Sequence, residues 1–330
     1  MTDERLPERR DQAAPPVSAR PACTPADATQ PGIGDSVTAS RGLTRRLLFA
    51  LATSERFEAG VRSLPFTSRF ALRRALRYVA GERMEDALAL GRGLDGEGLG
   101  VAVDFFGEQV SDRQQAEAAA DAYVDLAQRI AEVPDANVAI DLSHVGLDVS
   151  TDFCQRQLAR IVEALPAGRR LDVGAEDSPR TDATHNVVVA LARAGAPIQM
   201  TLQANLRRSA DDWPKLVDAG LAIRLVKGAY VERGDVAHPY GDASDIAYIS
   251  LTHALAQAGA RLALATHDPV LREALLTALG TIPIEMLLGV REDDARALVR
   301  RGVPVRLYVP YGKDWFRYWM RRLAEARGTS

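Results

Sequence analysis

The strongest constraint on this chain is a regular alternation of short apolar runs and helical segments that begins near Met84. Apolar runs of strand length recur eight times, and a segment with helical periodicity stands between each run and the next. The runs span residues 99–106, 138–142, 170–173, 198–202, 222–226, 261–266, 283–288 and 305–309. Strands that are joined through helices pair in parallel, so the alternation predicts a parallel sheet covered by helices.

Eight such units within residues 84–330 favour a closed (β/α)8 barrel over an open doubly wound sheet. In barrels of this kind the chemistry takes place at the C-terminal ends of the strands. Polar side chains gather at these predicted strand ends: Asp141, Glu176, Asp177, Gln203, Lys227, Tyr230, Thr266, His267 and Tyr308. A barrel with a purely structural role would not need them, so the sequence predicts a functional site at this end.

The segment before the barrel divides into two parts. Residues 1–40 are rich in Pro, Ala, Thr and Asp and lack apolar periodicity, which predicts a disordered tail. Residues 41–83 contain basic helical stretches and are interpreted as a separate N-terminal helical segment. Their arginines suit a solvated helix face better than a surface for acidic lipid.

Charge and cysteine content exclude some classes of protein. With 41 basic and 44 acidic residues the net charge is -3, and no basic stripe stands out, so we expect no nucleic-acid partner. Cys23 and Cys154 give neither a disulfide framework nor metal-ligand spacing, which is typical of a reducing cytoplasm. No apolar run has membrane-spanning length. We therefore predict a cytoplasmic protein, with contact at the inner face of a membrane still allowed.

Residues 91–96 spell the glycine pattern of dinucleotide-binding loops, Gly-x-Gly-x-x-Gly. The pattern follows a helical segment and precedes a strand, whereas phosphate binding requires the order strand, turn, helix. We interpret these residues as a glycine-rich loop without a nucleotide.

Arg224 is a cation inside an apolar run, and its burial is costly unless an anion compensates it. Either a bound ligand or a carboxylate on a neighbouring strand could supply that anion, and the sequence leaves both open. Lys227 and Gly228 follow at the end of the same run, where the glycine permits a ligand to approach the backbone closely.

His267 stands at the end of another strand and could be a core residue, a metal ligand or a cofactor contact. No second His or Cys lies at metal-ligand spacing, which disfavours a metal. After the last run, Asp314 is a plausible N-cap for an aromatic-rich helix that carries Tyr318, Arg321, Arg322 and Glu325 on one face. The two guanidiniums suit a carboxylate or a phosphate, although an arginine pair is often simply solvated.

Five segments carry a resemblance to a known family. They are Gly-Val-Ala-Val-Asp-Phe-Phe-Gly-Glu at 100–108, Arg-Leu-Val-Lys-Gly-Ala-Tyr at 224–230, Ala-Thr-His at 265–267, Tyr-Val-Pro-Tyr-Gly-Lys-Asp-Trp at 308–315 and Arg-Arg-Leu-Ala-Glu at 321–325. In this order they resemble the signature segments of the proline dehydrogenases. That family consists of FAD-dependent barrel enzymes that oxidise L-proline to Δ1-pyrroline-5-carboxylate by hydride transfer to the flavin N5.

The resemblance implies a role for each matching residue. Arg224 and Tyr308 are expected to be catalytic, with Arg224 beside the reactive flavin nitrogen, and Glu325 is expected to steady the arginine helix. The residues expected to bind substrate are Arg321, Arg322, Tyr230, Leu287 and Asp141. The residues expected to contact FAD are Ala175, Gln203, Val226, Lys227, Gly228, Ala229, Thr266 and His267. Electrons are expected to leave to a quinone or to oxygen.

Three positions depart from the family pattern. Asp141 stands where the family has a lysine, and Asn205 stands where it has a tyrosine. Gly174 replaces an aspartate that supports the equivalent of Tyr308, so the sequence predicts that Tyr308 has lost its partner. Asp172 could replace it if the strand slips by two residues, which keeps the same face.

These departures leave three hypotheses. The first is flavin-dependent oxidation of proline or a close cyclic amino acid. The second is an FAD-binding relative with an altered substrate, or with impaired catalysis and a regulatory role. The third, an unrelated phosphate-binding barrel lyase, explains the arginine pair but none of the other shared segments.

Overall fold

The computed structural model describes residues 73–326, without the side chains of Arg317, Arg321 and residues 323–326. The predicted tail at residues 1–40 lies outside this range, and so do residues 41–72 of the predicted helical segment.

Eight parallel strands close into a barrel in sequence order, and β8 completes the ring by pairing with β1. The strands are β1 Leu99–Phe105, β2 Ala136–Ile140, β3 Leu171–Val173, β4 Ile198–Gln203, β5 Ala222–Val226, β6 Leu262–Ala265, β7 Ile284–Leu287 and β8 Val305–Tyr311. This confirms the predicted (β/α)8 barrel.

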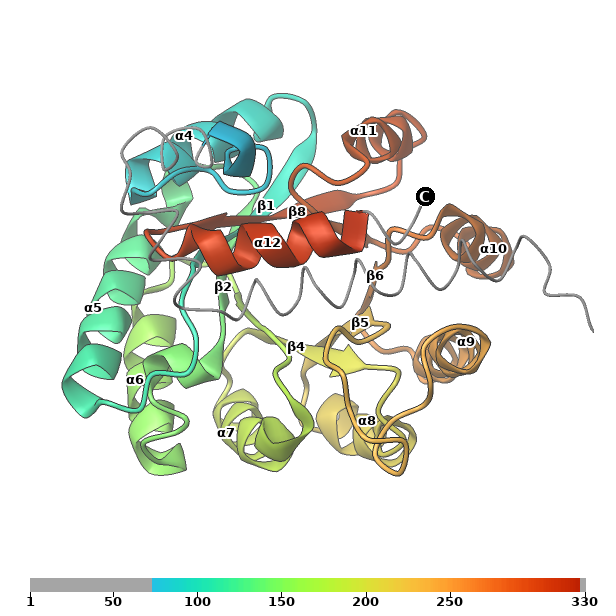
Figure 1. Cartoon of the computed structure of the whole chain (residues 1–330), viewed down its shortest axis with the longest axis horizontal. Helices are drawn as coiled ribbons and strands as arrows, with labels where there is room; N and C mark the ends of the chain where they lie inside the picture. The colour runs from blue at the N-terminus through green and yellow to red at the C-terminus, as the bar shows by residue number, and fades with distance from the viewer. Residues whose placement is uncertain (1–72, 327–330) are drawn as a thin grey trace, which may run out of the picture.

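Helices surround the barrel (Figure 1). They are α4 Met84–Asp95, α5 Arg113–Arg129, α6 Thr151–Ala164, α7 Thr181–Arg193, α8 Ser209–Asp218, α9 Asp242–Gln257, α10 Pro269–Leu279 and α11 Glu292–Arg300. A further helix, α12 Trp315–Ala326, follows β8. Short 3-10 turns occupy Ile130–Glu132, Leu142–Val145 and Ser178–Arg180.

The glycine-rich loop predicted at residues 91–96 is wrong, because α4 continues through Gly91 and Gly93. Gly91 is buried, and a Cβ added to it would lie 3.2 Å from a methyl group of Val133 and 3.3 Å from one of Val101. The glycine therefore lets the helix lie close against the barrel. It has a packing role that a search for a nucleotide motif cannot recognise.

Local capping fixes where several helices begin. Asp112 Oδ1 accepts the Gln115 N–H at 2.8 Å at the start of α5. At the start of α10, Asp268 accepts the N–H groups of Val270 and Leu271, and Pro269 fits the first helical turn. The β6–α10 junction that carries His267 is therefore a defined turn rather than a loose loop.

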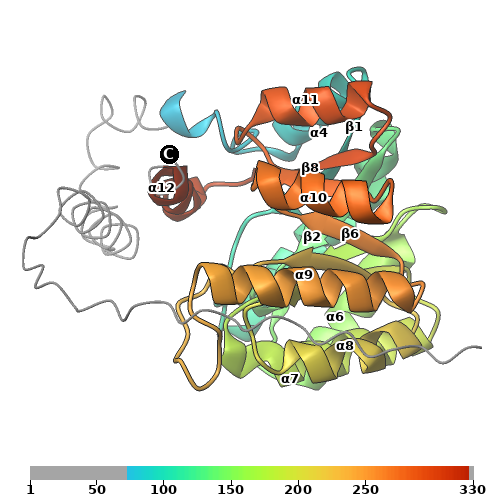
Figure 2. The ribbon, with the colours of Figure 1, turned by 90° about the vertical axis from the view of Figure 1, so that its right-hand side faces the viewer.

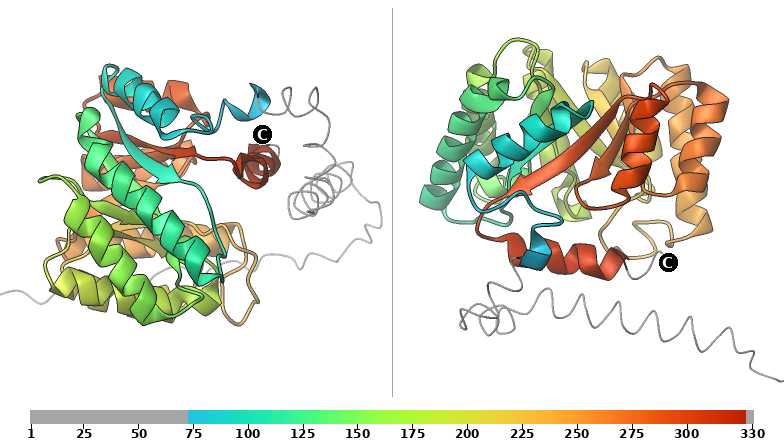
Figure 3. Two further views of the ribbon diagram at one scale, coloured as in Figure 1. Left: turned by 90° about the vertical axis from the view of Figure 1, so that its left-hand side faces the viewer. Right: turned by 90° about the horizontal axis from the view of Figure 1, so that it is seen from above.

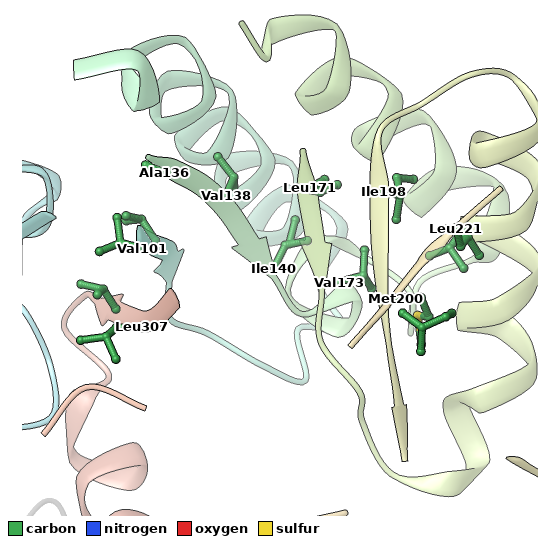
Figure 4. Packing of buried hydrophobic residues seen from close by; sticks show 14 of the residues in the cluster. Val101, Ala136, Val138, Ile140, Leu171, Val173, Ile198, Met200, Leu221 and Leu307 are labelled. Carbon is green, nitrogen blue, oxygen red and sulfur yellow. The ribbon is translucent and has the colours of Figure 1, made fainter. Parts of the chain in front are cut away.

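The apolar core lies between the strands and the surrounding helices. In Figure 4, Val138 and Ile140 of β2 project beside Leu171 and Val173 of β3, and all four belong to one buried cluster. Successive strand residues face opposite sides, so the residues between them face the barrel interior. Several of these interior positions hold polar side chains that are almost fully buried, namely Asp104, Asn137, Asp172, Gln199, Thr201, Gln203 and Glu285.

Helix α12 stands apart from the ring of helices and lies across the C-terminal end of the barrel (Figures 2 and 3). Its apolar face packs into a second buried cluster, composed of Ala75, Tyr78, Val79, Phe106, Trp315, Phe316, Tyr318 and Met320. Trp315 Nε1 also donates to Glu82 Oε1 at 3.2 Å. The described end of the N-terminal segment therefore holds α12 in place over the barrel mouth.

Within residues 73–326, none of the helices combines the length and the hydrophobicity needed to cross a bilayer.

Candidate active site

A cavity opens inside the barrel towards its C-terminal end. Its lining residues come from β1, β2, β3, β5, β7 and β8 and the turns that follow them. They are Ala102, Asp104, Ala139, Ile140, Asp141, Asp172, Gly174, Arg224, Glu285 and Tyr308. The structure thus brings three predicted site residues, Asp141, Arg224 and Tyr308, into contact with one space.

Arg224 pairs with a carboxylate inside the barrel. Its Nε lies 3.0 Å from Glu285 Oε2, which is an ion-pair distance, although the N–H is not aligned for a hydrogen bond. Its Nη1 is 3.5 Å from Thr201 Oγ1 on β4. A carboxylate partner was one of the two alternatives left open by the sequence, but Glu285 lies on β7, beyond the neighbouring strand β6. The arginine can reach it because both side chains point into the barrel interior.

Tyr308 has a carboxylate partner, so the predicted loss of its partner is wrong. The Tyr308 hydroxyl donates to Asp104 Oδ2 on the adjacent strand β1. Asp104 follows Ala102 by two residues, and Ala102 is paired with Tyr308 in the sheet, so both side chains face the same cavity. The other oxygen, Oδ1, lies 2.6 Å from the Tyr123 hydroxyl of α5.

The alternative prediction, that Asp172 replaces the lost partner of Tyr308 through a slip of the strand, is also wrong. β3 pairs with both of its neighbours in regular register, without a slip. Asp172 Oδ1 instead accepts from Arg170 Nε at 2.6 Å, near the start of the strand. Arg170 also lies 3.3 Å from Glu285, so it balances two of the buried carboxylates.

Asp141 and Gly174 lie against each other just after the ends of the adjacent strands β2 and β3. An ideal Cβ built on Gly174 would overlap Asp141 Oδ1. The Asp141 carboxylate therefore occupies space that a side chain on residue 174 would need, so the two departures from the family pattern are parts of one rearrangement.

Six of the eight predicted cofactor residues lie at the end of β5 or just after β5 and β6. Lys227 Nζ lies 2.7 Å from Asp245 Oδ1 and 3.1 Å from Asp268 Oδ2. Gly228 has a φ of 116°, which disfavours an L side chain, and a Cβ on it would overlap the amide of Asn205. Ala229 is exposed, and Val226 is half-buried at the end of its strand.

His267 has one satisfied and one unsatisfied ring nitrogen. Its Nε2 accepts the N–H of Leu287 at 3.2 Å, so the proton is assigned to Nδ1. Within the part of the chain that the structure describes, that buried Nδ1 has no hydrogen-bond partner. Burial, followed by the charge of Arg322, lowers the pKa of His267 to about 4, which keeps the ring neutral at physiological pH. A neutral ring with an unused donor suits a cofactor acceptor atom.

Two other predicted cofactor residues lie around a second cavity, between β4 and α7. Ala175 and Gln203 both line it. The Gln203 side-chain amide donates to the Glu176 carbonyl at 2.8 Å, so one of its hydrogens is already used. Thr266 is buried, and its hydroxyl accepts the Asp268 N–H at 3.2 Å.

The predicted arginine pair lies on α12. Arg322 stacks 5.0 Å above the ring of Tyr318, and that ring lies 6.0 Å from the Tyr308 ring. Arg322 is therefore close to the cavity wall rather than on a remote surface. The side chains of Arg321 and Glu325 are outside the described part of the chain, so their predicted roles stay predictions. Tyr230 is half-buried in the segment after β5.

Sequence reasoning missed the carboxylates that hold these residues. Asp104, Glu285 and Asp245 hold Tyr308, Arg224 and Lys227 respectively. Asp104 and Glu285 could have been noticed, because each is a charge inside an apolar strand, as Arg224 is. The role of Asp245 depends on how α9 packs, and no local pattern reveals it.

Comparison with known proteins shows the family to which the chain belongs. The family model described as proline dehydrogenase matches residues 87–330. Proline dehydrogenase 1 of Bacillus subtilis subsp. natto is 33% identical over 263 residues, covering 76% of this chain and 86% of that protein. Proline dehydrogenase of Deinococcus radiodurans is 33% identical over 265 residues, with the same coverage of 76% and 86%.

Solved structures support the same fold. Proline utilization A from Bdellovibrio bacteriovorus, inactivated by N-propargylglycine, superposes with a TM-score of 0.74 at 20% identity. The match covers 89% of this chain but only 38% of that longer protein. Proline utilization A from Bradyrhizobium japonicum gives a TM-score of 0.67 at 20% identity, over 79% of this chain and 31% of that one. The chain belongs to the proline dehydrogenase family, and it is an oxidoreductase of that type.

Proposed function

We propose that this protein uses FAD to oxidise L-proline, or a close cyclic amino acid, to an imine of the Δ1-pyrroline-5-carboxylate type. One observation carries the proposal: Arg224 and Tyr308 line the same cavity at the C-terminal end of the barrel. Beside it, His267 and Lys227 follow the ends of two adjacent strands. In barrels this is the end that carries the chemistry.

The residues present fit FAD. His267 offers a buried Nδ1 donor that has no partner among the described residues. Lys227 supplies a cation, and the positive φ of Gly228 allows close approach to its backbone. Bound FAD would supply a two-electron acceptor for the hydride that leaves C5 of the substrate. Further contacts with FAD are proposed for Ala175, Gln203, Val226, Ala229 and Thr266.

The protein's side chains would bind and orient the substrate. Arg321 and Arg322 would hold its carboxylate as a bidentate pair, while Tyr230, Leu287 and Tyr308 would contact the ring. Arg224 would place positive charge beside the reacting atoms, where charge develops during the reaction. Loss of hydride from C5 of the neutral amine leaves an iminium, and loss of the N–H proton gives the imine. Helix α12 lies across the barrel end and would limit the access of water.

A second candidate, an altered substrate or a regulatory relative with weak catalysis, is favoured by one observation. Asp141 adds a fourth carboxylate to a cavity lined by Asp104, Asp172 and Glu285. Only two cations, Arg224 and Arg170, pair with these carboxylates among the described residues. This excess of negative charge weakens the binding of an anionic amino acid relative to a neutral or cationic amine.

Electron transfer out of the protein completes the proposal. We expect a quinone or oxygen to be the acceptor, in a cytoplasmic protein that touches the inner face of a membrane if a quinone is used.

The test is reconstitution of the purified protein with FAD, followed by anaerobic titration with L-proline. The proposal expects a yellow protein whose flavin absorbance is bleached by stoichiometric L-proline. Parallel titrations with 4-hydroxyproline, pipecolate and pyrrolidine define the substrate. A colourless protein that cannot be reconstituted with FAD would contradict the proposal that the protein binds a flavin. A yellow protein whose flavin is bleached by pyrrolidine alone would contradict an amino acid substrate and support an altered substrate.

A further inference from the structure

Glu232 joins two loops at the C-terminal end of the barrel, and its partner lies 54 residues away along the chain. One carboxylate oxygen, Oε1, accepts the Ser178 N–H at 2.7 Å, and the other, Oε2, accepts the Ser178 hydroxyl at 2.7 Å. Ser178 lies in the turn after β3, whereas Glu232 lies in residues 227–241, the β5–α9 segment. β3 and β5 are the two neighbours of β4, so the contact links the loops on either side of that strand.

The carboxylate caps a helix start from a distance. Ser178 begins the 3-10 turn Ser178–Arg180, which continues directly into α7. Within the described part of the chain, the side chain of the N-cap residue Asp177 makes no capping bond and pairs with Arg180 instead. Glu232 therefore satisfies a backbone donor that the neighbouring sequence leaves open, at an end of a helix where negative charge is favoured.

The β5–α9 segment is attached at both of its ends to the turn after β4. The Asn205 N–H donates to the Lys227 carbonyl at 2.8 Å. Near the other end, Leu206 and Ala237 form an isolated antiparallel bridge. Between these two attachments, Glu232 ties the middle of the segment to a different loop, the turn after β3.

The residues on either side of Glu232 point outwards. Val231 is 93% exposed, and the Arg233 side chain is 82% exposed. Glu232 itself is only partly exposed, because its carboxylate turns towards Ser178. Tyr230, two residues earlier, is half-buried. A contact that fixes the backbone at Glu232 therefore also restricts where the backbone of Tyr230 can lie.

We propose that Glu232 is a positioning residue, which latches the middle of the β5–α9 segment to the turn after β3 and so fixes Tyr230 and the predicted cofactor residues 227–229. The inference rests on the proposed function for the identity of the two ligands, FAD and a cyclic amino acid. Glu232 acts through the segment rather than through contact with either ligand. Without the latch the closed segment loses two charge-assisted hydrogen bonds, so its open state is more populated and each ligand binds more weakly.

The first measurement is hydrogen–deuterium exchange on the full-length protein without FAD. The Arg207 and Ala237 amides report on the segment, because both donate to its carbonyls. Glu232→Ala should accelerate their exchange by about tenfold, as expected for the loss of bonds to a charged group. Glu232→Gln keeps an acceptor for the Ser178 N–H and should accelerate it less. In the Glu232→Ala background, Ser178→Ala should have no further effect, because the partner of the hydroxyl is already gone.

Asp235→Asn is the matched control. Asp235 is a carboxylate of the same segment, but it pairs with Arg233 inside the segment, and both side chains are well exposed. Its exchange should match that of the unmodified protein, since such a pair contributes little. Equally slow exchange in Glu232→Ala and in the unmodified protein would overturn the proposal. A uniform acceleration that includes the core strand β2 would also overturn it, because Glu232 would then support the whole fold.

The second measurement uses FAD and L-proline and separates positioning from chemistry. Glu232→Gln and Ser178→Ala should each weaken FAD binding about threefold to tenfold and raise the KM for L-proline by a similar factor. The rate of flavin reduction at saturating L-proline should change by less than about twofold, because no group beside the reacting atoms is altered. Accelerated exchange with unchanged FAD affinity would refute a positioning role.

The two measurements also separate this inference from the proposed reaction. If the unmodified protein binds no FAD, the proposed function fails, and the exchange data still decide whether Glu232 orders the segment. If FAD binds but L-proline does not bleach it, the reaction fails, and the FAD affinities of the variants decide the role of Glu232.

Discussion

Asp141 and Gly174 share one volume: the carboxylate of Asp141, just after β2, occupies the place where a side chain on residue 174 would begin. The carboxylate on this part of the cavity wall is thus supplied from the end of β2, and residue 174 must stay small for it to fit. In the sequence, each of these two positions looked like the loss of a charged side chain that the family pattern contains, and this contact changes that interpretation. Together they keep a carboxylate at the wall, beside the Tyr308–Asp104 pair.

Gly174→Ala tests this relationship. The added methyl group should displace Asp141 and lower the free energy of unfolding by about 1–3 kcal/mol, the usual cost of overpacking. Combined with Asp141→Ala, the same methyl group should cost less than about 0.5 kcal/mol, because the overlapping oxygen is gone. Chemical denaturation of the four proteins in the cycle measures both values. Equal costs of Gly174→Ala in the two backgrounds would show that the side chains do not compete for space.

From the Arg224–Glu285 pair we predict that a second substitution can restore the stability lost with Arg224 without restoring the activity. Arg224→Gln leaves Glu285, which is 6% exposed, with only Arg170 and Gln199 nearby, and should lower stability by about 1–3 kcal/mol. Adding Glu285→Gln removes the unpaired charge and should restore most of that loss. Flavin reduction by L-proline should remain impaired in both variants, because the positive charge is missing. Recovery of activity in the double variant would show that Arg224 serves only to neutralise Glu285.

His267 gives a prediction for cofactor binding. His267→Ala removes the Nδ1 donor and should weaken FAD affinity about threefold to tenfold, the range expected for one neutral hydrogen bond. Because burial lowers the pKa of His267 to about 4, its contribution should not change between pH 6 and pH 8. Fluorescence titration of the apoprotein with FAD measures both effects. His253→Ala, in the C-terminal half of α9, is the control, and an equal loss in the two variants would refute a specific contact.

Arg322 should act on substrate affinity. Arg322→Ala should raise the KM for L-proline by about tenfold or more, since a charge-assisted hydrogen bond to the carboxylate is lost. Arg322→Lys keeps the charge but not the planar fork, so it should recover only part of the affinity. Arg193→Ala, on the exposed end of α7, is the control. Steady-state kinetics of Arg322→Ala that match this control would place Arg322 outside the substrate site.

The pKa of Asp104 leads to a prediction of how the stability of the protein depends on pH. Burial raises the pKa of its carboxyl from 3.8 to about 6, partly offset by the hydrogen bonds from Tyr123 and Tyr308. The folded protein then holds this proton more tightly than the unfolded chain, so the stabilising contribution is present below pH 3.8 and is lost as the pH rises through about 6. Asp104→Asn has no such loss, and at pH 7 it should be more stable by up to about 3 kcal/mol.

Denaturation curves between pH 4 and pH 7 measure this difference. The titratable and charged groups that face Asp104 are Tyr308 and Tyr311 of β8, Tyr123 of α5 and Asp141 after β2, with Arg224 and Glu285 across the cavity. A variant that is less stable than the unmodified protein at pH 7 would contradict the raised pKa. A more stable and less active variant would show that the buried carboxylate is maintained at a cost in stability.

The fold was readable from the sequence because its signal is local and repeated. Each strand is a short apolar run and each helix has its own apolar face, so errors at single boundaries do not change the topology. The errors came at the ends of elements. β8 continues through Pro310 to Tyr311, whereas the predicted run ends at residue 309, because β8 pairs with β1 as far as Phe105.

Only part of the candidate site could be predicted from the sequence. Arg224, Tyr308 and His267 could be picked out because they stand at strand ends or interrupt apolar runs. Their partners could not, since Asp104 lies 204 residues from Tyr308 along the chain and meets it only because the barrel closes. The predicted loss of a partner for Tyr308 failed for this reason.

The sequence by itself determined the alternating strands and helices, the end of the barrel at which polar side chains gather, and the types of residue found there. These follow from periodicity and composition, which act over a few residues at a time. The tertiary structure alone decided which charges meet: Tyr308 with Asp104, Arg224 with Glu285, and Asp141 in the space beside Gly174. Such pairings depend on which strands become neighbours and on the angle at which side chains enter a shared interior, and neither is encoded locally.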